Sequence, residues 1–130
     1  MMKNYYEIIV LTAADEEYAS TVLDFIEKNQ KYFSHRLFKN HCILKQNFYL
    51  FKNLNVLTKN RLIKDIIIVD NIVRNFALFI CNGIPIIDYK GTNDDFELCK
   101  LSNFLVQLAS NENCTEFIRN NIVKSLLKNE

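Results

Sequence analysis

Two short runs of apolar side chains constrain the fold of this chain more than any other feature. One covers residues 6–12 and is rich in β-branched side chains, and the other covers residues 65–70 with four consecutive Ile and Val residues. Strands that are apolar on both faces are typical of parallel sheets covered by helices on both sides. Because such runs alternate here with helical patterns, we predict an α/β fold with a mainly parallel sheet.

Helical spacing follows the first run, over about residues 15–29. Asp15, or Ala14 before it, lies near the expected N-cap, and acids in the first turn suit the helix dipole. One apolar face of this predicted helix contains Tyr18, Ala19, Val22, Leu23, Phe25 and Ile26.

The rest of the chain predicts shorter elements and two closing helices. Asn82-Gly83 is a turn dipeptide that leads into a strand, and Thr115 is the expected N-cap of the last helix. The predicted strands cover residues 36–38, 42–44, 48–51 and 84–87, and the predicted helices about 54–63, 72–77, 94–109 and 115–128. The apolar faces of the closing helices contain Leu98, Leu101, Leu105 and Leu108, then Ile118, Ile122 and Leu126.

Composition limits the class of protein. A length of 130 residues with 49% apolar residues fits one domain over residues 1–130. A net charge of +1 argues against a nucleic-acid partner, which calls for a clustered basic excess. The apolar runs are far shorter than the roughly twenty residues of a membrane-spanning helix. The first residues resemble no secretory signal, so we expect an intracellular protein, nuclear or cytoplasmic, with mitochondrial import left open.

The cysteines and histidines give no metal-binding pattern. Cys42, Cys81, Cys99 and Cys114 are widely spaced without a Cys-x-x-Cys pair, so we expect buried reduced thiols. His35 and His41 have no further ligand at metal-binding spacing and are assigned structural or surface roles.

Polar side chains close both apolar runs and are the candidates for chemistry. Thr12 ends the first run, and Asp70-Asn71 ends the second. In parallel sheets, ligands bind beyond the carboxyl ends of the strands. A hydroxyl beside free backbone N–H groups can hold phosphate, and an acid beside an amide can hold Mg²⁺. Taken singly, Thr12 and Asp70 are better explained as caps of the helices that follow.

Taken in order, these segments resemble one family over nearly the whole chain. The series runs Ile9-Val10-Leu11-Thr12, Arg36-Leu37-Phe38, Tyr49 with Lys52, Ile66 to Asn71, Asn82 to Ile86, and Asp95 to Leu98 with Leu101, Phe104, Leu105 and Leu108. It is similar to the phosphatases that act on the C-terminal domain of RNA polymerase II, the NLI-interacting-factor-like branch of the haloacid dehalogenase superfamily.

The resemblance implies a fold and a role for each matching residue. It implies a three-layer, haloacid-dehalogenase-like (Rossmannoid) parallel sheet flanked by helices. Thr12 matches the hydroxyl that binds the transferred phosphoryl group, and Lys52 matches the lysine that neutralises phosphate charge. Asp70 matches the Mg²⁺-binding acid, with Asn71 as its neighbour. Ile72-Val73 stand where the family often has Ser-Pro.

Active members of the family also carry an Asp-x-Asp-x-Thr/Val strand at the centre of the sheet. Its first Asp is the nucleophile and its second is the general acid/base. The seven Asp residues of this chain include no pair spaced i, i+2, so it begins, by resemblance, at the second core strand. We therefore expect a truncated domain that lacks the first central strand, has no catalytic residue of its own and needs no cofactor, with Mg²⁺ bound only where the site is completed.

Three functions remain open. The first is a catalytically inactive phosphatase-homology domain that acts as a protein-interaction or assembly subunit, as in the related mitochondrial presequence-translocase receptor. The second is a fragment or split subunit of a Mg²⁺-dependent protein serine/threonine phosphatase with an aspartyl-phosphate mechanism. The third is a plain interaction module without phosphate binding. A protein partner that donates a strand fits the first two.

Overall fold

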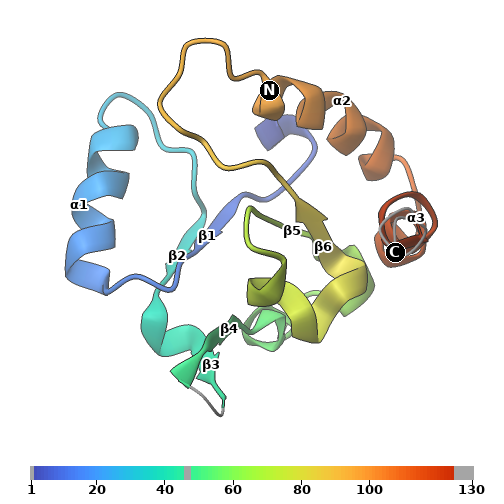
Figure 1. The fold of residues 1–130 in the computed structure, drawn as a ribbon, viewed down its shortest axis with the longest axis horizontal. Helices are drawn as coiled ribbons and strands as arrows, with labels where there is room; N and C mark the ends of the chain where they lie inside the picture. The colour runs from blue at the N-terminus through green and yellow to red at the C-terminus, as the bar shows by residue number, and fades with distance from the viewer. Residues whose placement is uncertain (1, 46–47, 125–130) are drawn as a thin grey trace. The chain divides into compact units, whose positions relative to one another are not determined.

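The computed structural model describes residues 2–45 and 48–124, and it divides the chain into two compact units. Unit 1 is Met1–Asn53 and unit 2 is Leu54–Glu130. Both combine short strands with helices, so the predicted α/β class is confirmed at this level (Figure 1). Within the described ranges, no helix has the length and apolar character that crossing a bilayer requires.

Unit 1 contains one parallel and one antiparallel pair of strands. Strand β1 (Ile9–Leu11) runs parallel to β2 (His35–Leu37), with Ile9 opposite His35. Strands β3 (Cys42–Leu44) and β4 (Leu50–Lys52) form an antiparallel hairpin, with Cys42 opposite Lys52. Helix α1 (Glu16–Ile26) connects β1 to β2, which makes a β-α-β unit, and 3₁₀ turns cover Met2–Asn4 (η1) and Lys39–His41 (η2).

Helix α1 packs through only part of its apolar face. Ala19 and Leu23 are buried with Phe38, and Val10, Ala14 and Phe33 pack around them. Asp15 is the N-cap, as predicted, although its side chain makes no capping hydrogen bond. The other residues of the predicted apolar face are exposed: Tyr18, Val22, Phe25 and Ile26.

The end of α1 comes earlier than the predicted residue 29, and its side-chain contacts explain why. Glu27 is the C-cap, and its carboxylate accepts hydrogen bonds from the Arg36 guanidinium at 2.9 Å and from the Tyr32 backbone N–H at 2.9 Å. Asp24 accepts a second bond from Arg36 at 2.7 Å. The guanidinium therefore ties the last turn of α1 to β2, and its hydrogen bond to Glu27 lowers the pKa of that carboxyl against the opposing effect of burial.

Unit 2 is built on a second parallel pair. Strand β5 (Ile68–Asp70) runs parallel to β6 (Gly83–Pro85), with Ile68 opposite Gly83, and Ile86 N–H extends the ladder to the Asp70 carbonyl at 3.1 Å. The connection η6 (Val73–Asn82) consists of 3₁₀ turns with a kink rather than one regular helix. Two more 3₁₀ turns, η4 (Leu54–Leu57) and η5 (Ile63–Asp65), stand where a helix over 54–63 was predicted.

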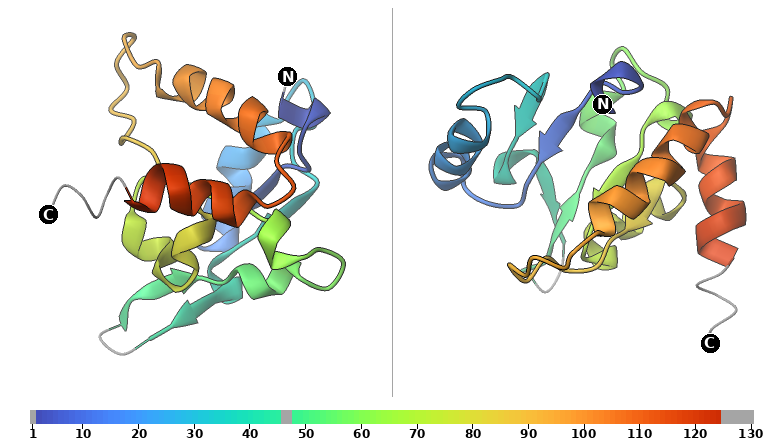
Figure 2. Two further views of the ribbon diagram at one scale, coloured as in Figure 1. Left: turned by 90° about the vertical axis from the view of Figure 1, so that its right-hand side faces the viewer. Right: turned by 90° about the horizontal axis from the view of Figure 1, so that it is seen from above.

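The core of unit 2 lies between β6 and the closing helices. Helix α2 (Glu97–Ala109) is followed by α3 (Cys114–Ile118), which continues as the π-helical turn η7 (Arg119–Val123). Figure 2 shows α2 and α3 meeting at the short connection 110–113. Ile84, Leu108, Cys114 and Ile118 are buried together, and the rings of Phe104 and Phe117 lie 5.5 Å apart beside them.

Several local predictions in unit 2 were wrong for identifiable reasons. Leu98, predicted on the buried face of α2, is 71% exposed. The N-cap of α3 is Asn113 instead of Thr115, since the Asn113 side chain accepts the Glu116 N–H at 3.1 Å while Thr115 donates to it. Asn82 ends the 3₁₀ segment η6 and leads into β6, as predicted, but its buried side-chain amide, which donates to the carbonyls of Ile63 and Ile66 at 2.8 Å, was not predicted. Leu126 and the end of the last predicted helix lie outside the described residues.

Candidate functional site

Thr12 lies one residue beyond the carboxyl end of β1. Its backbone N–H donates to the Leu37 carbonyl at 3.0 Å, which extends the parallel ladder past the strand. Its hydroxyl oxygen accepts the Ala14 N–H at 3.1 Å, which closes a tight turn toward α1. The side chain therefore organises the turn, and its O–H proton is still available to donate to a ligand.

Lys52 and Thr12 share Cys42 as a neighbour within unit 1. Cys42 and Lys52 face each other in the β3–β4 ladder. The Cys42 thiol donates to the Thr12 carbonyl with a sulfur–oxygen distance of 3.9 Å. Burial raises the pKa of this thiol, and the positive charge of Lys52 opposes that rise. Cys42, a thiol that stays protonated at neutral pH, thus neighbours the backbone of Thr12 and is paired with Lys52 in the β3–β4 ladder.

Asp70 ends β5 and is buried at 5% exposure. One carboxylate oxygen accepts the Ile72 N–H at 2.9 Å, and the Asn75 amide lies 3.2 Å from each of the two oxygens. This pattern fastens the start of η6 to the strand, because a buried carboxylate must be hydrogen-bonded. Both Asp70 oxygens are therefore engaged within the protein.

Asn71 follows Asp70 directly but points to a different partner. Its side-chain amide donates to an Asp88 carboxylate oxygen at 2.8 Å, and both side chains are exposed. Asp88 lies three residues beyond Pro85, the last residue of β6. Because β5 and β6 are parallel, the segments that follow them leave the sheet at the same edge, and this pair spans that edge.

The side chains at this edge carry oxygen atoms, which are the type of ligand that Mg²⁺ binds. Mg²⁺ prefers oxygen ligands, usually keeps several waters and is commonly bound through one or two carboxylates together with substrate phosphates. The Asn71 amide oxygen and the neighbouring carboxylates are of this type. No group of three or more His, Cys, Asp or Glu side chains with metal-binding geometry occurs among the residues that the structure describes.

Both histidines contact neighbouring residues of unit 1. His41 accepts the Phe38 N–H through Nδ1 at 3.1 Å, and His35 lies 3.5 Å from the Glu7 carboxylate. Of the cysteines, Cys114 is buried, Cys42 and Cys81 are half-buried and Cys99 is exposed, so the expectation of four buried thiols was wrong for Cys99.

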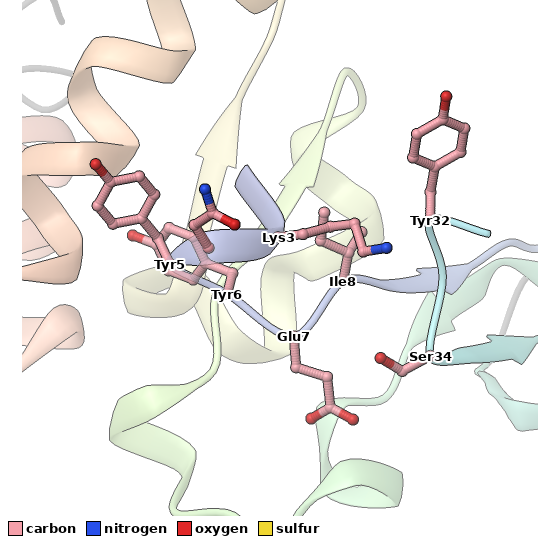
Figure 3. A pocket seen from close by; sticks show the side chains of 8 residues that line it. Lys3, Tyr5, Tyr6, Glu7, Ile8, Tyr32 and Ser34 are labelled. Carbon is pink, nitrogen blue, oxygen red and sulfur yellow. The ribbon is translucent and has the colours of Figure 1, made fainter. Parts of the chain in front are cut away.

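An open pocket of about 400 Å³ lies elsewhere in unit 1, at its beginning (Figure 3). Tyr5 and Tyr32 stand on opposite sides of it, and the Lys3 ammonium donates to the Lys31 carbonyl at 2.8 Å. Neither Thr12 nor Lys52 lines this pocket. It is therefore separate from the residues that the sequence singles out.

Comparison of the sequence with known protein families identifies the family of this chain. The family model "NLI interacting factor-like phosphatase" matches residues 1–119. The chain belongs to this family. The resemblance seen in the sequence is thereby confirmed, including its link to the mitochondrial branch.

Three relatives show the range of the family. "CTD small phosphatase-like protein 2" of Dictyostelium discoideum is 34% identical over 118 residues, which cover 91% of this chain and 20% of the relative. "CTD small phosphatase-like protein 3" of Caenorhabditis elegans is 36% identical over 104 residues, 80% of this chain and 35% of the relative. "Mitochondrial import inner membrane translocase subunit TIM50" of Candida glabrata is 30% identical over 111 residues, 85% of this chain and 22% of the relative. The chain therefore spans 20–35% of the length of these relatives.

Sequence reasoning missed the residues that hold the second strand end in place. Asn75 is an amide inside the apolar segment Ile72 to Ile80, which is the one sequence signal that it has a buried partner. Asp88 gives no such signal, since it lies 17 positions after its partner Asn71 and the contact depends on the register of β5 and β6. Cys42 was predicted only as a buried reduced thiol, and its contacts with the Thr12 carbonyl and with Lys52 across the ladder were not predicted.

Proposed function

We infer that these 130 residues act as a phosphatase-homology domain for protein interaction or assembly and do not hydrolyse phosphoesters by themselves. The observation that carries this proposal is chemical. An aspartyl-phosphate mechanism needs a nucleophilic Asp with a second acid two residues later, and the sequence holds no such pair. Thr12 and Lys52 can hold phosphate and Asn71 can offer an oxygen to Mg²⁺, but none of them supplies the attacking carboxylate.

The edges of the parallel pairs support the interaction role. Within the described ranges, β1 pairs with β2 and β5 pairs with β6, so each strand has one hydrogen-bonded neighbour. The residues of β1 are Ile9-Val10-Leu11, without the Lys or Pro that commonly protects an edge strand. A strand from another chain, or from another segment of a longer chain, can add to such an edge by main-chain hydrogen bonds.

In this proposal the domain has the haloacid-dehalogenase-like layering of its family. Within unit 1, Thr12 and Lys52 offer phosphate a hydroxyl and a positive charge. Within unit 2, Asp70 keeps the turn after β5 in shape through Asn75. Mg²⁺, when bound, neutralises charge on the phosphoryl oxygens.

The second candidate is a split or partial Mg²⁺-dependent protein phosphatase. Its supporting observation is that the relatives named phosphatase-like are three to five times longer than the part matched here, as the 20% and 35% coverages show. In this case the same strand position is filled by a segment that carries the Asp pair. The two candidates differ in what the added strand contributes, and so they can be separated by experiment.

A hydrolysis assay tests the proposal. The purified 130-residue chain is incubated with Mg²⁺ and p-nitrophenyl phosphate beside its Thr12→Ala and Lys52→Ala variants. We expect no turnover above the buffer rate for any of the three. Sustained turnover by the wild type that Thr12→Ala abolishes would overturn the proposal.

A second arm adds a synthetic strand peptide that ends in Asp-x-Asp-x-Thr. Turnover that appears only with the peptide, and only with Thr12 intact, establishes the split phosphatase. Binding of the peptide without turnover, seen as slowed amide exchange in β1, supports the interaction domain. A peptide with both Asp residues changed to Asn is the matched control, since it keeps the strand and removes the nucleophile.

A further inference from the structure

Helix α1 carries an exposed stripe of apolar side chains beside its buried face. Its members follow one another at i, i+4, i+7 and i+8, which places them along one side of the helix. The exposed stripe consists of Tyr18, Val22, Phe25 and Ile26, and two of these are largely in water, Tyr18 at 71% and Phe25 at 78% exposure. A contiguous exposed apolar patch rimmed by polar residues is typical of a protein interaction site.

Two opposite charges lie on one flank of the exposed stripe. Glu17 is in the first turn of α1. Lys28 follows the C-cap, and its backbone N–H donates to the Phe25 carbonyl at 3.3 Å, which keeps it on the last turn. The two charges are eleven positions apart, which is about three turns at 3.6 residues per turn. Both side chains are exposed, so they project from the same side of the helix at its two ends.

We propose that the exposed stripe binds a second copy of this chain, antiparallel, across a two-fold axis at Val22. Position 22 is midway between Tyr18 and Ile26, and the mean of 17 and 28 is 22.5, so the stripe and the charges share one centre. A two-fold axis across the interface reverses the direction of one helix. Tyr18 then meets Ile26 of the second copy. Glu17 meets Lys28 of the second copy, and the surface is complementary to itself.

The charges favour the antiparallel arrangement over a parallel one. Two parallel copies in register would place Glu17 beside Glu17 and Lys28 beside Lys28, and these like charges repel. The antiparallel pair also brings opposite ends of the two helix dipoles together. Asp24, which lies on the same flank, is held by Arg36 at 2.7 Å and would face Thr21 of the second copy. Asp24 therefore meets no like charge.

The size of this interface limits its strength. Stable complexes bury about 1,200–2,000 Å² in total, and one side of an 11-residue helix offers only part of that area. We therefore expect a weak, reversible dimer with a Kd in the micromolar range or above, which dissociates on dilution. The interface uses other residues than the edge of β1, so the inference goes beyond the proposed function and does not rest on it.

Analytical ultracentrifugation of the purified chain over a wide range of concentrations tests the pairing. We expect a monomer–dimer equilibrium for the wild type. Glu17→Lys and Lys28→Glu should each weaken the dimer about tenfold, because each turns two attractive contacts into repulsive ones. Phe25→Ser should abolish it. Leu98→Ser, which removes a comparably exposed apolar side chain from α2, is the matched control and should leave the equilibrium unchanged.

Mixing the two charge variants makes the test specific for the antiparallel pair. Each variant repels its own copies, whereas a mixed pair of Glu17→Lys with Lys28→Glu has attraction at both contacts. We expect the mixture to dimerise within about threefold of the wild type, since the same two ion pairs form with their charges exchanged. The double variant, which exchanges the two charges within one chain, should do the same.

Thermal melts at the low end of the concentration range show whether each variant is folded, so that a lost dimer is not mistaken for a lost fold. A wild type that stays monomeric at every concentration would overturn the proposal and would leave the exposed stripe to another segment of a longer chain or to a different protein. Single charge variants that dimerise as the wild type does, or a mixture that fails to recover, would show that the copies meet through another surface and would overturn it equally.

Discussion

The two units use their helices differently. In unit 2, α2 and α3 bury Leu108 and Ile118 completely, at 0% exposure, around the end of β6. In unit 1, α1 buries Ala19 and Leu23 but leaves Phe25 78% exposed. Helices α1 and α2 are both amphipathic in sequence, so the difference lies in how many packing partners each apolar face finds.

This comparison shows that an apolar face on a helix can be buried, but that the surrounding structure determines how much of it is buried. Among the described residues of unit 1, one core cluster packs against α1, and it covers only part of the apolar surface of the helix. Unit 2 closes its core with two helices and a strand. Stability should accordingly be concentrated in unit 2, and the following substitutions test this, from the largest expected effect to the smallest.

The largest effect is expected from Leu108→Ala in unit 2. Leu108 is fully buried, and truncating such a side chain costs about 3–5 kcal/mol through lost burial and the cavity left behind. Leu23→Ala in unit 1 is the matched change and should cost about 2–3 kcal/mol, because fewer buried neighbours surround it. Hydrogen exchange read by peptide mass spectrometry measures each unit separately. A larger loss from Leu23→Ala would reverse the comparison.

The next effect is expected from Gly83→Ala at the start of β6. A Cβ atom at this position would overlap the ring of Phe76, which is 1% exposed and has no room to move. Overpacking of this kind costs about 2–3 kcal/mol. Gly91→Ala is a control of a different kind, since nothing lies near its Cβ position and only its positive φ of 76° opposes the change. Denaturant unfolding measures both, and a neutral Gly83→Ala would show that the Phe76 ring yields.

A smaller, pH-dependent effect is expected at the Arg36–Glu27 pair of unit 1. The hydrogen bond from Arg36 lowers the pKa of Glu27 below its usual value of 4.5. A depressed pKa contributes stability that is present above the unfolded value and is lost as pH falls through the folded value. Glu27→Gln should therefore destabilise unit 1 at neutral pH and remove part of its acid sensitivity.

The control for this pair is Glu97→Gln in unit 2, where Glu97 holds the largely exposed Lys100 at 2.9 Å. Exposed pairs contribute little, so its thermal midpoint should hardly change. Thermal melts from pH 3 to pH 7 compare the variants. If the thermal midpoints of wild type and Glu27→Gln changed equally with pH across this range, the pair would not contribute the pH-dependent stability assigned to it.

The smallest effect is expected from Phe25→Ser on the open side of α1. Since the ring is mostly in water, the free energy of unfolding should change by less than about 0.5 kcal/mol. Solubility should rise, because an exposed aromatic ring favours association. The concentration at which light scattering begins, together with a thermal melt, gives both quantities. Destabilisation by more than about 1 kcal/mol would show that another part of the protein covers this face.

The sequence predicted best where one local pattern decides the structure. The apolar run before Asp70 predicted strand β5, and the spacing of Leu101, Leu105 and Leu108 predicted α2. Asp15 marked the start of α1. In each case neighbouring residues alone determine the backbone. The residue types at Thr12, Lys52, Asp70 and Asn71 also pointed to the family that the comparison confirmed.

Prediction failed where the outcome depends on contacts between distant residues. Asn82-Gly83 leads into strand β6 as predicted, but nothing in this dipeptide indicates that the Asn82 amide is buried and donates to the distant carbonyls of Ile63 and Ile66. The helix predicted over 54–63 gives way to 3₁₀ turns, the first of which the Thr58 hydroxyl closes on the Asn55 carbonyl at 2.8 Å. The Asn71–Asp88 pair exists only because the register of two strands brings it together.

The buried amide of Asn82 has a consequence for the lifetime of the protein. Asparagine followed by glycine is prone to lose its side-chain ammonia whenever the chain opens. Such a reaction here would exchange a donor of two hydrogen bonds for a negative charge facing two carbonyl oxygens at 2.8 Å. A molecule that is deamidated at this position while unfolded cannot re-form these two hydrogen bonds. Each unfolding event therefore carries a risk of irreversible damage at Asn82.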